Sequence, residues 1–331
     1  MKFKMAAMGF PSGWNYLGDI SKEEDVKRLA ENGLNSVAVW TNKFRVWADP
    51  VLSKGLEKTL INAKKYGLRY YSMLYLGTSF NFYSPVKYGL FVERNGKKTK
   101  TACPLDKTFW TECIIKEAVN IARLLKEVDG VLLELELYGG GGRYSQGCFC
   151  DQCFKGFVAQ ANVTAPDIPP EKRHRWLASK GLLKEYYDWL SFNVYENYKM
   201  YGEELLAVNE DLTLGFYEGG HLDSFLWYIK AAMRGLSDAG ARILILDPIT
   251  YSGGDIWNKV SKQKLKLSTM KAKTWYLPGL YLDAVEVGVE GIGYLCSVLL
   301  EIADGYWIWN ERVNIENPQL WENLRRANAT Y

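Results

Sequence analysis

The sequence predicts an α/β fold: a single (β/α)8 barrel (TIM barrel) that spans residues 1–331 and has long loops after strands three and four. Short apolar runs alternate with amphipathic stretches, a pattern typical of parallel strands with helical crossovers. Eight such pairs fit the chain, and 48% of its residues are hydrophobic, which is enough for one large core. A doubly wound fold is the weaker alternative because no GxGxxG turn follows the first strand.

The expected elements follow one another in order along the chain. Strands are expected at residues 3–9, 34–40, 68–76, 128–138, 212–217, 242–247, 274–282 and 305–310. Helices are expected at residues 21–32, 52–66, 107–126, 171–209, 223–238, 256–270, 285–303 and 318–329. Two loop excursions, 77–106 and 139–177, interrupt the alternation, and insertions of this length in a compact domain are usually functional.

The charge pattern narrows the classes of partner. The net charge is only +3 and the densest basic run, residues 95–100, is short, so we expect no nucleic-acid partner. No uncharged apolar stretch reaches membrane-spanning length, so we expect a soluble cytoplasmic protein with no membrane partner. The two His and the many Lys, Glu and Tyr would suit a thermophile. The long aromatic loops could close a pocket or contact a neighbouring subunit of a homo-oligomer.

The fourth predicted strand carries two carboxylates on one face. Side chains alternate along a strand, so Leu132, Glu134, Glu136 and Tyr138 share a face. Burial of unpaired charge is costly, and perturbed carboxylates cluster at functional sites. This pair therefore indicates either an ion-pair network or a catalytic site, and we favour the catalytic one.

Further acidic residues follow the ends of the later strands, where a barrel places its chemistry. They are Glu218, Asp247, Asp283 and Glu311, and the aromatic residues Trp40, Trp307 and Trp309 end strands two and eight. Any one of these acids could be a helix cap or a loop ion pair, but five strand-end acids at one rim, Glu136 included, favour a site.

Two carboxylic acids across a pocket, one protonated and one ionised, can cleave a glycosidic bond. We predict Glu136 as the general acid/base, with Asp247, Glu218 or Asp283 as the second carboxylate. Glu134 could tune Glu136 by sharing a proton with it. The residues predicted to contact a carbohydrate substrate are Glu134, Tyr138, Trp40, Trp307, Trp309 and Glu311.

Other barrel chemistries find less support in the residues. A Schiff-base aldolase needs a strand-end lysine, and strands four to eight have none. A catalytic metal site needs His and Asp or Glu grouped together, but of the two histidines, His174 and His221, only His221 lies at a strand end, near Glu218. The glycines after strand seven could bind phosphate, but strand eight lacks matching ones. No organic cofactor is expected.

Three cysteines lie within six residues, at Cys148, Cys150 and Cys153. They are too close for unstrained mutual disulfides and suit one tetrahedral zinc, for which Cys103 in the other excursion is the natural fourth ligand. Such a zinc site would be structural because all four positions come from the protein. The alternative is four reduced thiols without a metal.

With Glu136 just before them, these cysteines resemble those of the zinc-bearing barrel domain of family 42 β-galactosidases and related glycosidases, over residues 97–157. The resemblance implies that Glu136 is the acid/base and that Cys103, Cys148, Cys150 and Cys153 bind zinc. Leu135 stands where that family has Asn. That family also has a glutamate at the end of strand seven, and the carboxylate nearest to that position in this sequence is Asp283.

A second similarity, at residues 129–136, is to family 18 chitinase-like barrels, with the pattern DGxDxDxE changed at Leu132 and Glu134. It again implies that Glu136 is the acid. The departures from both families motivate an alternative from another class, a carbohydrate-binding barrel without catalysis.

Overall fold

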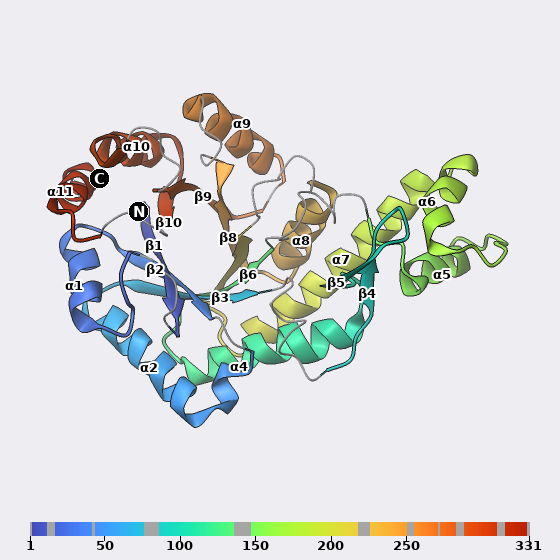
Figure 1. Cartoon of the computed structure of the whole chain (residues 1–331), viewed down its shortest axis with the longest axis horizontal. Coiled ribbons are helices and arrows are strands. Elements are labelled where there is room, and N and C mark those ends of the chain that lie inside the picture. The colour runs from blue at the N-terminus through green and yellow to red at the C-terminus, as the bar shows by residue number, and fades with distance from the viewer. Residues whose placement is uncertain are drawn as a thin grey trace.

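The computed structural model describes residues 2–11, 17–41, 44–75, 86–135, 147–217, 226–249, 255–270, 272–282, 288–309 and 315–329. In these ranges eight parallel strands close into a barrel, which confirms the predicted fold (Figure 1). Around the barrel the order is β1 (Phe3–Phe10), β10 (Gly305–Trp309), β9 (Thr274–Tyr281), β8 (Arg242–Asp247), β7 (Thr213–Tyr217), β6 (Gly130–Glu134), β3 (Arg69–Tyr75) and β2 (Ser36–Thr41).

Helices form a layer outside the strands (Figure 1). They are α1 (Glu23–Glu31), α2 (Pro50–Lys65), α4 (Lys116–Leu124), α7 (Leu183–Leu206), α8 (Leu226–Asp238), α9 (Ile256–Ser268), α10 (Gly288–Ile302) and α11 (Pro318–Ala329), with a short 3-10 helix η1 (Val46–Ala48) before α2. Among the described residues no helix is both long and apolar enough to cross a membrane.

The excursions after β3 and β6 hold structure that the sequence pattern did not predict. The first contains an antiparallel hairpin, β4 (Leu90–Val92) and β5 (Lys98–Ala102), and the second contains α5 (Asp151–Gln160). Two expected helices were also wrong in detail. The helix expected at 107–126 is a π-helix, η2 (Phe109–Ile115), that continues into α4. The helix expected at 171–209 is two helices, α6 (Pro170–Ser179) and α7, because Gly181 between them adopts a left-handed φ of 70°.

We call residues 90–103 and 147–182 the cysteine arm. Figure 1 shows α5 and α6 at the end of the molecule opposite α1 and α11, with α7 running from the barrel toward them and the β4–β5 hairpin beside it. Both segments of the arm leave the barrel after the carboxyl ends of strands β3 and β6, on the side where a barrel carries its active site.

Contacts between distant strands show which side chains face the barrel interior. Trp40 of β2, Tyr217 of β7 and Trp307 of β10 come from strands that are not neighbours, yet their ring centroids lie 5.4 to 6.2 Å apart. They can meet only inside the barrel. The register pairs Tyr217 with Glu134 on β6 and with Leu246 on β8, and paired residues of parallel strands point to the same side. Glu134 therefore points inward.

Candidate functional site

An aromatic cluster fills the barrel interior near the carboxyl ends of the strands. Trp40, Tyr217 and Trp307 are buried, with exposed fractions of 2%, 6% and 1%. Trp309, one inward position further along β10, lies edge-on to Trp40 at 5.3 Å and is only half-buried. Of the three predicted substrate-contacting tryptophans, Trp309 is therefore the one that offers a partly exposed ring face for a sugar.

A glycine makes room for this cluster. A Cβ atom at Gly279 of β9 would lie 2.4 Å from the Trp307 ring, a distance that real contacts essentially never show. Gly279 pairs with Trp307 in the sheet, so both residues face inward and the indole occupies the space that a side chain would need. Pro278 and Gly279 thus complete a strand that sequence propensity alone would disfavour.

Glu134 is the acidic residue that the structure places among these rings. It ends β6, it is 1% exposed, and it stands level with Tyr217. Its inward direction agrees with the face predicted from the sequence. Among the other predicted site residues, Glu136, Tyr138, Glu218, Asp283 and Glu311 lie outside the described residues, so their positions stay predictions.

Asp247 has a different environment from the one we expected. It follows Leu246, which faces inward, so alternation directs Asp247 to the outer side of β8. Its carboxylate accepts a 2.5 Å hydrogen bond from the Tyr276 hydroxyl and a 2.9 Å bond from the Ile249 N–H, and the residue is 1% exposed. This geometry gives Asp247 a role in holding the start of the loop after β8.

A third buried carboxylate, Glu117, was not predicted from the sequence. It is 2% exposed in α4 and accepts hydrogen bonds from the Trp47 indole N–H at 2.6 Å and the Arg45 backbone N–H at 3.0 Å. Burial raises its pKa to about 7. Glu117 thereby holds the loop that follows β2, the strand that carries Trp40. A signal existed: Glu117 stands between Ile114 and Ile121 at helical spacing, on the apolar face.

The four predicted cysteine ligands come together, as the spacing indicated. One sulfur atom from each of Cys103, Cys148, Cys150 and Cys153 lies within 4.8 Å of the others, and all four residues are buried. The Cys103 sulfur is 3.4 Å from that of Cys153 and 3.6 Å from that of Cys150. Sulfur ligands about 2.3 Å from a central ion would lie at similar mutual distances, so the site fits a tetrahedral metal.

The electrostatics of the cluster also fit a cation. Burial raises the pKa of the Cys103 and Cys153 thiols, whereas hydrogen bonds from neighbouring thiols, that of Cys103 above all, lower the pKa of Cys150. Four thiolates cannot share a buried site without positive charge. These residues could therefore hold a metal ion that is bound entirely by protein.

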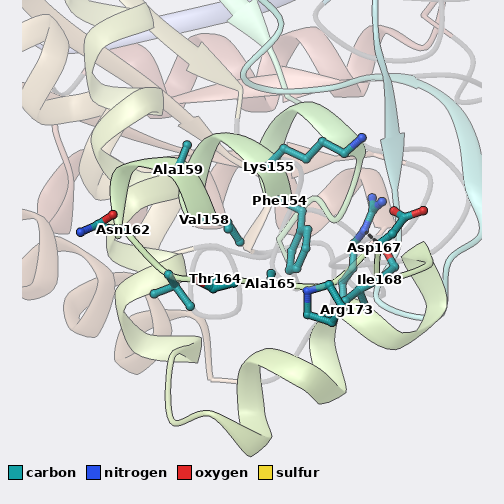
Figure 2. A pocket seen from close by; sticks show the side chains of 12 residues that line it. Phe154, Lys155, Val158, Ala159, Asn162, Thr164, Ala165, Asp167, Ile168 and Arg173 are labelled. Carbon is teal, nitrogen blue, oxygen red and sulfur yellow. Dashed lines mark hydrogen bonds between the residues drawn. The ribbon is translucent and has the colours of Figure 1, made fainter.

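The part of the arm beyond the cysteines is fastened by a buried arginine. The Arg173 guanidinium donates to the backbone oxygens of Ile168 and Phe149 and pairs with Asp151. Figure 2 shows a cavity of about 460 Å³ beside it, into which Phe154 and Val158 point from α5 toward the segment 163–168. All the residues that line the cavity belong to the arm, and neither Glu134 nor the aromatic cluster of the barrel is among them.

No protein-family model and no curated protein matches the sequence. Solved structures match the fold. A β-galactosidase from the psychrophilic Marinomonas ef1 has a TM-score of 0.65 at 10% identity over 99% of this chain and 59% of that chain. An agarase has a TM-score of 0.55 at 10% identity, over 93% of this chain and 48% of that chain. A glycoside hydrolase family 5 enzyme from Prevotella bryantii B14 has a TM-score of 0.50 at 10% identity, over 98% of this chain and 96% of that chain.

This chain thus spans 59% of the first protein, 48% of the second and nearly all of the third. At this level of identity the likeness shows the fold. The chain has the (β/α)8 barrel found in these glycoside hydrolases, in agreement with the prediction from the sequence.

Proposed function

We propose that this protein is a glycoside hydrolase in which Glu136 is the general acid/base. The observation that carries the proposal is the inward, buried carboxylate of Glu134 among aromatic rings at the end of β6. Glu136 follows two positions later in the sequence, and strand alternation predicts the same face for it. Apolar surroundings and a second carboxylate nearby both raise the pKa of a carboxylic acid, as a proton donor near neutral pH requires. The fold shared with glycoside hydrolases supports this reading.

The second carboxylate is Glu218 or Asp283 in this proposal. Asp247 is the weaker candidate because its carboxylate is occupied by Tyr276 and Ile249 and is shielded from solvent. A separation of about 5 Å from Glu136 would give retention of the anomeric configuration, and roughly 6.5 to 9.5 Å would give inversion. Trp309 would stack on the sugar that occupies the mouth.

We further propose that the ion held by Cys103, Cys148, Cys150 and Cys153 is zinc. Its part would be structural, because the four sulfurs leave no position for water or substrate. Cys103 comes from the excursion after β3 and the other three from the excursion after β6, so the site would tie the two loops together beside the barrel mouth.

The test is hydrolysis of a panel of aryl α- and β-glycosides by the purified protein and by Glu136→Gln. We expect one glycoside to be cleaved and the variant to lose at least about a hundredfold in rate, which is the size expected for the loss of a general acid. Glu127→Gln is the matched control, because Glu127 is exposed and precedes the opposite end of the same strand. It should keep the wild-type rate.

One outcome would refute the hydrolase, and another would refute the role of Glu136. If wild type cleaves no glycoside yet binds oligosaccharides, the protein is a carbohydrate-binding barrel; if Glu136→Gln cleaves as fast as wild type, Glu136 is not the acid. If the reaction retains configuration, a 2-deoxy-2-fluoro glycoside will trap the covalent intermediate, and peptide mass analysis will place it on Glu218 or on Asp283.

A further inference from the structure

The cysteine arm is more basic than the rest of the chain. It carries nine Lys and Arg residues against four Asp and Glu, although the whole chain has a net charge of only +3. The remainder of the chain is therefore slightly acidic. A basic arm that leaves the barrel on the side of the strand ends brings a positive field toward the mouth, and such a field attracts anionic ligands.

The arm concentrates part of this charge where the hairpin meets α6. A Cβ atom at Gly96, in the hairpin turn, would lie 2.8 Å from Glu171, so the turn packs directly against the first turn of α6. Arg94 stands in this turn, is exposed, and forms no ion pair with any residue of the described ranges. His174, one turn further along α6, packs edge-on against Phe149 at 5.6 Å. Burial lowers the pKa of His174 and the charge of Arg94 lowers it further, so the imidazole is neutral near pH 7 and can donate one ring N–H to an anion.

Two aromatic side chains, Tyr187 of α7 and Trp227 of α8, lead from this part of the arm toward the barrel. The ring of Tyr187 in α7 lies 2.9 Å from where a Cβ atom of Gly147 would stand, and 6.2 Å from the ring of Trp227. Gly147 is the first described residue after the segment that contains Glu136. Trp227 lies in the first turn of α8, which follows the segment that contains Glu218. Both rings are half-buried, and the Arg94 charge reaches Tyr187 as well.

We propose that Arg94, with His174 beside it, binds the acidic group of an extended glycan, either a carboxylate or a sulfate ester, while neighbouring sugar rings stack on Tyr187 and Trp227. The proposal rests on the glycoside hydrolase function, to which it adds a substrate class. A guanidinium matches the two oxygens of such groups with parallel hydrogen bonds. Aromatic rings bind the apolar faces of sugars whatever their charge. The rings therefore provide affinity, and Arg94 selects the acidic glycan.

The experiment measures binding by isothermal titration to three tetrasaccharides: tetragalacturonate, a sulfated galactan fragment and neutral galactotetraose. Wild type is compared with Arg94→Gln and with Lys155→Gln, a matched control. Lys155 is an exposed cation of the same arm, and it lies in α5, where it faces Asp151 rather than the hairpin turn. We expect Arg94→Gln to weaken the preferred acidic probe at least about tenfold, the size of one charge-assisted hydrogen-bonded contact. Galactotetraose binding should change less than about twofold. The tighter of the two acidic probes names the group.

The proposal is overturned if neither acidic probe binds more tightly than galactotetraose, or if Arg94→Gln and Lys155→Gln weaken binding equally. It is also overturned if single-stranded DNA of equal charge binds as tightly, because the arm would then be a general polyanion surface. Cleavage of a neutral aryl glycoside without acidic preference would leave the hydrolase intact and remove only the substrate class. If the protein prefers an acidic probe but cleaves no glycoside, the proposed binding site stands and the hydrolase function is refuted.

Discussion

The barrel and the cysteine arm are built from the same chain but are held together by different means. The barrel is closed by a continuous ladder of parallel strands around an apolar interior, so each strand is fixed by two neighbours. The arm has one short hairpin and two helices of ten residues each, and it depends on particular side chains. Those are the four cysteines, Arg173 and Tyr186, whose hydroxyl donates to the Cys148 carbonyl.

This difference shows how a rigid scaffold can carry a specialised loop region. Strand pairing tolerates many side-chain changes, whereas a small unit with little core needs a staple. Loss of a staple should therefore loosen the arm and leave the barrel folded. The predictions below test that contrast, beginning with the largest expected effect.

Cys153→Ser should release the proposed metal ion and unfold the arm. Structural zinc contributes on the order of 10 kcal/mol to the folding of small zinc domains. The arm has little core of its own, so no other interaction in it can replace a contribution of that size. We expect metal content to fall from one ion per chain to near none, and limited proteolysis to cut within residues 147–182. Far-UV circular dichroism should retain most of the barrel signal.

Cys113→Ser is the matched control for that variant, because Cys113 is equally buried but lies in the π-helix outside the cluster. It should keep the metal and resist the protease. If Cys153→Ser also abolishes the cooperative unfolding of the barrel, the two regions are one folding unit and the contrast is wrong.

Arg173→Ala should destabilise the arm by about 3 kcal/mol, because the Ile168 and Phe149 carbonyls lose their buried donors. The Asp151 contact adds little, since that carboxylate is largely exposed. Hydrogen exchange of amides in 147–182 measures the loss. Arg175→Ala, at an exposed position of the same helix, should change exchange little. Equal protection in both variants would mean that Arg173 is not a staple.

Glu117→Gln tests whether the barrel too relies on a particular buried side chain, here the carboxylate that holds the loop after β2. The folded-state pKa of Glu117 is about 7, above its usual 4.5, so the folded protein binds this proton more tightly than the unfolded chain does. The free energy of unfolding should therefore fall as pH rises from about 4.5 to about 7. We expect a fall of about 2 kcal/mol that is absent in Glu117→Gln, measured by urea unfolding across this range.

Glu112→Gln serves as the control, because Glu112 lies on the exposed side of the adjoining helical turn and pairs with Lys116. It should show the same pH dependence as wild type. If the free energy of unfolding has the same pH dependence in Glu117→Gln and in wild type, the Glu117 carboxylate titrates near its ordinary pKa. Its hold on the loop after β2 is then not pH-sensitive.

Much of the barrel could be predicted because its signals are local. The run RILILD at residues 242–247 gave a strand whose ends the structure reproduces. The hairpin of the arm was missed because residues 90–102 are rich in Lys and Thr and lack an apolar alternation. Its pairing becomes favourable only in the folded arm, where Thr99 and Thr101 are buried and the Val92 N–H donates to the Cys148 sulfur.

The candidate site was predictable to the extent that it depends on strand alternation. That rule placed Glu134 on a face with Leu132, and the closed sheet turned that face inward. The same rule directs Asp247 out of the barrel, because Leu246 before it faces inward. The position of Asp247 at a strand end was therefore not enough to predict a place in the site. Its hydrogen bond with Tyr276 joins residues 29 positions apart, which no local pattern reveals.

The sequence by itself determined the alternation of strands and helices in the barrel, the face of Glu134, and the grouping of cysteines at short spacing. These depend on periods of two to four residues, which local backbone geometry sets. Only the tertiary structure decided that Trp40, Tyr217 and Trp307 fill one interior, that Asp247 is held by Tyr276, and that Glu117 receives the loop after β2. Each of those contacts exists because barrel closure brings distant segments into one buried volume, where side chains must pack and polar atoms must find partners.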